Sequence, residues 1–162
     1  MTPIFLLDEL EKFISAVTND IKLKVRVRGG QSDEKERAAN VYKMRLPNKE
    51  AQIQKVPYIL LQFLTGKDDK KDSEPEDSEC TVRIVVATYS ENGEVGAYDV
   101  LNVILRIRTE LEKIGIIGGY FALQKPLEYI VYPDSTEPYY LGEMITNWSI
   151  PTIKREVEAT WL

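Results

Sequence analysis

The carboxylate best placed for acid-base chemistry is Glu143, the one acidic residue in YYLGEMITNW, residues 139–148. An apolar pocket raises the pKa of a carboxyl group, so such surroundings could tune Glu143 into a general acid. Strand alternation, however, places Tyr140, Met144 and Trp148 on one side and Glu143 on the other. The pattern therefore favours a partly exposed or intersubunit face for Glu143 over a catalytic pocket.

Other residue types narrow the chemistry further. The sequence of 162 residues contains no histidine. This removes the usual general base at neutral pH, the triads that need an imidazole, and the commonest transition-metal ligand. Glycine-rich phosphate-binding fingerprints are missing, and the pair Gly118 and Gly119 indicates a tight turn. We therefore expect no catalytic residues, no cofactor and no enzymatic activity.

The densest charge lies in GKDDKKDSEPEDSE, residues 66–79, which has seven acidic and three basic side chains and no large apolar one. Asp68, Asp72 and Glu79 fall at positions 1, 5 and 12 of a calcium-binding loop, but Lys70 occupies a ligand position and the central glycine is missing. We therefore expect no metal. A segment without apolar side chains cannot repay its ordering entropy, which predicts a flexible acidic surface loop.

Charge and composition restrict the partners. The net charge is -5, which argues against a surface built mainly to neutralise phosphates. The one cysteine, Cys80, begins an apolar run, so we expect a buried thiol. The N-terminal MTPIFLLDELEKF does not resemble a secretory signal, and no apolar run approaches the roughly 20 residues that span a membrane.

Apolar spacing predicts helices over residues 4–17 and 97–114, the second ended by Gly115. Strict alternation in IKLKVRVR, residues 21–28, predicts a strand with four cations on one face. These cations are Lys22, Lys24, Arg26 and Arg28. A strand with such a face could bind an acidic partner or simply be solvated.

The remaining strands come from apolar runs. VPYILLQFL, residues 56–64, has apolar residues on both alternating sets, which predicts a central strand that pairs with residues 80–89. The segment PDSTEP predicts a hairpin connection between LEYIVY and YYLGEMITNWSIP. Residues 29–55 show no sustained period and are interpreted as a long excursion. We predict a single α/β (α+β) domain over residues 1–162, with an antiparallel or mixed sheet of four to five strands and helices packed on it.

The order of these blocks resembles the phage tail terminator proteins, also called tail completion proteins, which phages and prophages encode. The resemblance covers residues 56–156 and is carried by VPYILLQFLTG, by TYS before GAYDVLN, and by GEMITNWSIPTI. It implies a structural protein whose subunits form a hexameric ring on the tail tube. The ring would end tube polymerisation and offer a surface for head attachment.

The resemblance also implies the partners: further copies of this chain, the tail tube protein and a head-tail connector protein. DNA would pass through the lumen without specific binding, and no membrane is involved. The location implied is the virion tail, assembled in the bacterial host cytoplasm. Another head-to-tail joining or neck protein, and a non-catalytic binding module, remain as alternatives.

Candidate intersubunit or tube contacts combine the basic strand, the acidic loop, the outward carboxylate and an aromatic residue near the C-terminus. Trp161 either docks on a neighbour or frays with the tail. The candidates are Lys22, Lys24, Arg26, Arg28, Asp68, Asp69, Asp72, Glu143 and Trp161.

Overall fold

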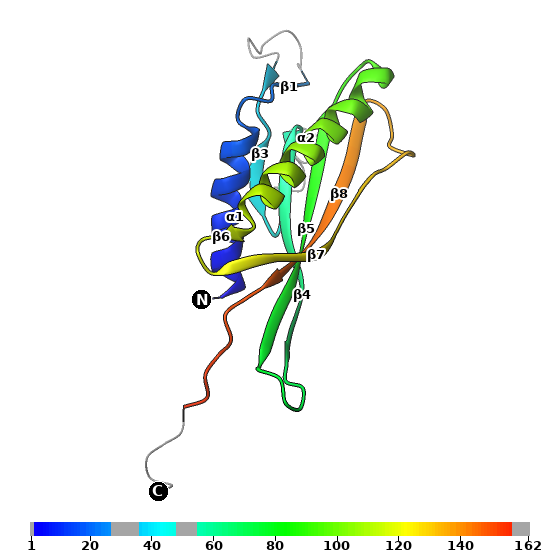
Figure 1. The fold of residues 1–162 in the computed structure, drawn as a ribbon. Coiled ribbons are helices and arrows are strands. Elements are labelled where there is room, and N and C mark those ends of the chain that lie inside the picture. Colours follow the sequence, from blue (N-terminus) through cyan, green and yellow to red (C-terminus); the bar gives the residue numbers. More distant parts are fainter. Residues whose placement is uncertain (1, 27–35, 48–54, 157–162) are drawn as a thin grey trace, which may run out of the picture.

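The computed structural model describes residues 2–26, 36–47 and 55–156. In these residues two helices, α1 (Pro3–Thr18) and α2 (Gly93–Ile114), lie on one face of a long, twisted sheet (Figure 1). The sheet order is β3 (Asn40–Lys43), β4 (Tyr58–Asp69), β5 (Asp77–Tyr89), β8 (Tyr139–Ser149), β7 (Phe121–Val131) and β6 (Ile116–Ile117). A separate two-stranded sheet joins β1 (Leu23–Lys24) to β2 (Glu36–Arg37).

The fold class is α+β with a mixed sheet, as predicted, but the expected four to five strands are too few. The main sheet has six strands, and every pair is antiparallel except the parallel pair of β3 and β4. Two kinds of strand were missed. β3 lies in residues 29–55, where the sequence has no clear period, and β6 is only two residues long.

Both helices bury an apolar stripe against the sheet. The buried side chains of this core include Leu6, Leu7, Leu10 and Ile14 from α1, Val100, Val103, Ile104, Ile107 and Leu111 from α2, and Ile59, Leu61, Val82, Ile84, Val86, Met144 and Trp148 from the strands. Helix α2 begins four residues before the predicted start, because the Asn92 side chain accepts a hydrogen bond from the Glu94 amide. It ends at Gly115, which has φ +69°, as the sequence indicates. Ile114, expected in the stripe, is instead 49% exposed.

Helix α2 lies very close to β8 because each element has a glycine where it contacts the other: Gly96 in α2 and Gly142 in β8. A Cβ atom on Gly142 would lie 2.6 Å from Val100 Cγ1 and 2.9 Å from the Ile130 carbonyl oxygen. A Cβ atom on Gly96 would lie 2.1 Å from the Tyr140 ring. These distances are shorter than any normal contact between atoms. The packing of α2 on β8 therefore requires glycine, which has no side chain, at both positions.

The acidic loop predicted over residues 66–79 is mostly strand, so its predicted extent is wrong. β4 continues to Asp69 and β5 begins at Asp77, with Lys67 opposite Glu79 and Asp69 opposite Asp77. Only residues 70–76 connect the strands. Backbone pairing forms a ladder without apolar side chains, which the entropy argument from composition overlooked. We call residues 64–79 the hairpin arm; it projects beyond the rest of the sheet (Figure 1).

The basic strand predicted over residues 21–28 is shorter in the structure. Ile21 and Leu23 are buried while Lys22 and Lys24 are exposed, so the alternation is confirmed there, but β1 contains only residues 23 and 24. No helix in the described part of the chain has the length and apolarity needed to cross a membrane.

Candidate functional site

The sheet has a second face, which points away from α1 and α2 and which we call the outer face. Among the described residues no helix covers it (Figure 1). One half of this face carries a small core in which Val56, Ala87 and Tyr89 are buried beside Tyr58 and Tyr139. The other half, between Arg83 and the hairpin arm, carries the polar side chains of Gln62, Thr81 and Asn147.

Arg83 and Glu143 form an ion pair at the centre of the outer face. They come from neighbouring strands, β5 and β8, and the Arg83 Nε donates to a Glu143 carboxylate oxygen. Arg83 also donates to Gln62 Oε1 at 3.3 Å and to Tyr132 Oη at 3.4 Å. Burial opposes the Arg83 charge, but the hydrogen bonds with Tyr132 and Glu143 raise the pKa of the guanidinium.

The structure places Glu143 on the outer face of the sheet. Glu143 points away from the helices, as strand alternation predicts, and its carboxylate is held by a cation. Its side chain is 20% exposed and that of Arg83 is 34% exposed, so the pair is accessible from the outer face. The ion pair joins β5 to β8 on that face.

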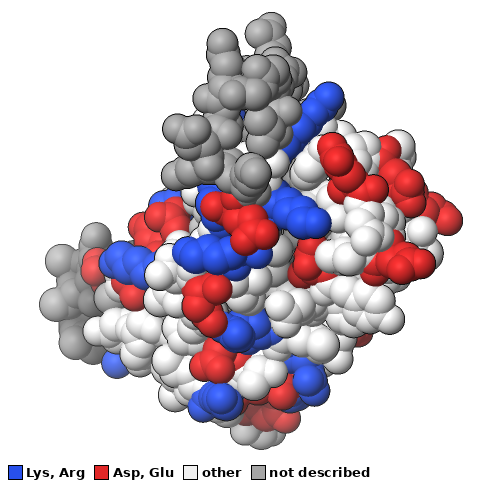
Figure 2. Space-filling view, turned by 90° about the horizontal axis from the view of Figure 1, so that it is seen from above, with Lys and Arg blue, Asp and Glu red and all other residues white. Residues whose placement is uncertain are grey.

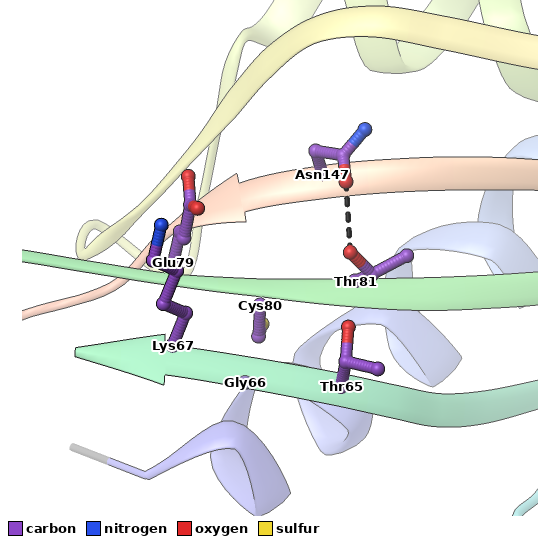
Figure 3. A pocket seen from close by; sticks show the side chains of 7 residues that line it. All are labelled: Thr65, Gly66, Lys67, Glu79, Cys80, Thr81 and Asn147. Atoms are coloured by element: carbon purple, nitrogen blue, oxygen red, sulfur yellow. Dashed lines mark hydrogen bonds between the residues drawn. The ribbon is translucent and has the colours of Figure 1, made fainter. Parts of the chain in front are cut away.

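A hollow of about 380 Å³ lies on the outer face where the hairpin arm leaves the body (Figure 3). The Thr81 hydroxyl donates to the Asn147 side-chain oxygen at 2.8 Å and closes one side of the hollow. Its lining residues come from β4, β5 and β8: Thr65, Gly66, Lys67, Glu79, Cys80, Thr81 and Asn147. The hollow is open and is lined by both polar and apolar atoms, which suits a contact with an extended peptide better than enclosure of a small apolar ligand.

The outer side of the hairpin arm is acidic. Asp69 lies directly opposite Asp77, and Glu79 lies two residues further along the same face. Like charges directly opposite each other on two strands are destabilising. Lys67 offsets part of this repulsion, with its Nζ 3.5 Å from Asp69.

The other predicted acidic contacts differ from Asp69. Asp68 points to the opposite side of the arm, where it accepts a hydrogen bond from the Ser78 hydroxyl. Asp72 is exposed in the connection over residues 70–76.

The predicted basic contacts lie at the opposite end of the molecule from the arm (Figure 1). The Lys22 ammonium donates to the Asn19 carbonyl at 3.1 Å, and the Arg26 guanidinium donates to Tyr139 Oη at 2.6 Å. Seen from that end, the basic and acidic side chains of the described residues are interspersed (Figure 2). Both side chains therefore have a hydrogen-bond partner within the subunit itself.

Lys24 lies near the acidic side chains of Asp99 and Glu36. Burial raises the pKa of the Asp99 carboxyl, Lys24 counteracts this, and Glu36 adds to it. The candidates Arg28 and Trp161 lie outside the described residues. The structure therefore separates the basic and acidic candidates rather than joining them within one subunit.

Sequence reasoning did not include Arg83, Tyr132 or the C-terminal residues 151–156 among the candidate contacts. Arg83 had a signal, because it is the one cation within the apolar run CTVRIVVATY. The contact with Tyr132 had none, because it joins residues 49 positions apart. Within the described residues no group of three or more His, Cys, Asp or Glu side chains is arranged to hold a metal ion.

Comparisons with known proteins give little help with function. No family model matches the chain, and no curated protein matches it. One solved structure, whose name describes no function, aligns over 93% of this chain and 93% of its own with 9% identity and a TM-score of 0.45. A likeness of that size carries no argument about fold or function.

Proposed function

We propose that this protein is a structural component of a phage tail, which forms a ring on the tail tube, ends tube polymerisation and presents a surface for head attachment. The sequence blocks over residues 56–156 support this proposal through their resemblance to tail terminators. The structural observation behind it is the uncovered outer face with its projecting arm. Such a surface suits contacts between protein subunits, because an open sheet face and an extended hairpin can be covered by a neighbour.

A ring needs two different patches on each subunit. A cyclic assembly of more than two copies is heterologous, so one patch binds a different patch on the next copy, and the ring has unlike upper and lower faces. One face can then match the tube while the other does not accept further tube subunits. The overall charge of -5 would let DNA pass through the lumen without cationic phosphate contacts.

The proposal is tested with tail tube protein that polymerises in solution. We expect added protein to give shorter tubes, each with a ring at one end in negative-stain images. Albumin at the same concentration serves as the control for crowding. Tubes that elongate normally without end rings would contradict the terminator function, and binding to the connector protein alone would identify a neck protein instead.

A further inference from the structure

The C-terminal segment, residues 151–156, leaves the body without joining any element (Figure 1). The Ile150 amide still donates to the Ser78 carbonyl at 2.9 Å, but Pro151 has no amide hydrogen and the pairing ends there. Ile153 is 84% exposed, the highest value among the large apolar side chains of the described residues. An extended segment with such a residue gains stability when another surface buries it.

The charges beside Ile153 indicate which surface would bury it. Lys154 and Arg155 follow Ile153 directly and are both exposed. The outer side of the hairpin arm holds Asp69 opposite Asp77, with Lys67 as the cation within ion-pair distance of Asp69. Two further cations would relieve this repulsion, and residues 151–156 provide them.

The spacing of the two segments also matches. The hollow at the base of the arm is lined by Thr65, and the acidic pair begins four residues further along β4. An extended chain rises about 3.3 Å per residue, so a long Lys or Arg side chain just after Ile153 covers much of that distance. Side chains alternate along an extended chain, so Ile153 and Arg155 lie on the same side. Ile153 can therefore occupy the hollow while Arg155 reaches Asp69 and Asp77, and Lys154, on the other side, adds positive charge near them.

We propose that residues 151–156 of one copy bind the outer face of the hairpin arm of a second copy. Ile153 fills the hollow, Arg155 pairs with Asp69 and Asp77, and Lys154 adds positive charge beside them. Within one subunit the arm and this segment extend in diverging directions (Figure 1), so the contact is made between copies. Because it joins two different patches, it can repeat around a ring, and for its biological purpose it rests on the proposed function.

Cysteine cross-linking tests the contact directly. One population carries Ile153→Cys, a second carries Thr65→Cys with a different tag, and the two are mixed under mild oxidation. We expect a disulfide between the two tagged chains at least tenfold more abundant than in a control mixture of Ile153→Cys with Lys12→Cys. Lys12 is an exposed cation on α1, and its side chain is 73% exposed. Absence of the cross-link, or an amount equal to the control, would overturn the proposal.

Charge reversal tests the same contact without cysteines. We expect Lys154→Glu with Arg155→Glu to weaken self-association at least tenfold by sedimentation velocity, and Asp69→Lys with Asp77→Lys in the second population to restore it. The control variant, Lys12→Glu with Lys113→Glu, changes two cations that pair within their own helices. The proposal would be contradicted if mixing the two charge-reversed populations did not restore self-association. It would also be contradicted if the control variant weakened self-association as much as Lys154→Glu with Arg155→Glu does.

The outcomes separate this contact from the proposed function. Capped tubes without the cross-link would remove the contact and leave the terminator function in place. A cross-link together with normally elongating tubes would keep the contact and remove the terminator function. Unchanged melting curves would show that every variant is folded, as expected because the arm and the C-terminal segment lie outside the core.

Discussion

Cys80 lies at the base of the hairpin arm with 2% of its surface exposed, and burial raises the pKa of its thiol to about 11. At pH 8 only about one thiol in a thousand would be ionised, and the thiolate is the reactive form. We expect an aromatic disulfide reagent to label native Cys80 at least 100-fold more slowly than the chain unfolded in guanidinium. Labelling followed by absorbance measures both rates. Equal rates would mean that the base of the arm opens freely.

The ion pair between Arg83 and Glu143 should contribute modestly to stability. Glu143→Gln leaves a half-buried guanidinium without its counter-charge, and partial exposure limits the cost to about 1 kcal/mol. In a domain of this size we expect the melting temperature to fall by about 2–4 °C. Glu110→Gln, which breaks an exposed pair within α2, should lower it by less and serves as the control. A larger fall for Glu110→Gln would contradict this ranking.

For single residues, the sequence predicted the side of the strand on which a side chain lies better than it predicted the partner of that side chain. The outward direction of Glu143 and the burial of Cys80 both follow from alternation along one strand, and the structure confirms them. The partner of Glu143 did not follow, because the ion pair joins strands 60 residues apart and depends on their register. A pattern within one strand carries no information on that register.

At the scale of elements, the contact of α2 with β8 depends on Gly142. Gly142→Ala would place a Cβ atom 2.6 Å from Val100 and 2.9 Å from the Ile130 carbonyl oxygen, and backbone cannot move aside easily. We expect a loss of about 1–3 kcal/mol in the free energy of unfolding, measured by urea denaturation. Gly66→Ala is the matched control, because the tightest contact of its Cβ would be the far end of the Phe63 ring at 3.2 Å. An equal loss in both variants would argue against close packing as the cause.

Elements with a strong apolar period were predicted well and the others were not. Both helices, the pairing of β4 with β5 and the hairpin of β7 and β8 followed from spacing and turn residues. β3 has only four residues and pairs in parallel with β4, so its position depends on long-range contacts that its own sequence does not show. The arm was missed for another reason, because composition reports side-chain burial and not backbone pairing.

At the scale of the whole molecule, the acidic arm and the exposed C-terminal segment are two different patches on one chain. A contact between unlike patches leaves one of each free on every dimer, so further copies can add until a ring closes. A contact between identical patches would stop at the dimer. The number of copies that associate therefore reports which kind of contact the molecule uses.

Mixing two defective variants separates these cases. The first variant carries Lys154→Glu with Arg155→Glu, and the second carries Asp69→Lys with Asp77→Lys. We expect a marked loss of association in each variant alone. Their mixture can form two kinds of contact. The intact C-terminal segment of the second variant fits the intact arm of the first, and the two reversed patches also complement each other.

Larger assemblies in that mixture should therefore contain the two variants in alternation, with equal numbers of each. Native mass spectrometry counts both chains. A sharper test uses a third variant, in which Asn-Gly replaces residues 69–77 and so shortens the arm. Because the shortened arm has no charge to reverse, its mixture with the first variant can make only one contact and should stop at a heterodimer. Two results together would require two unlike patches on each subunit. These are heterodimers alone in the mixture with the shortened arm, and alternating assemblies in the mixture of the two charge-reversed variants. Homodimers of either variant alone would instead require a contact between identical patches elsewhere on the surface.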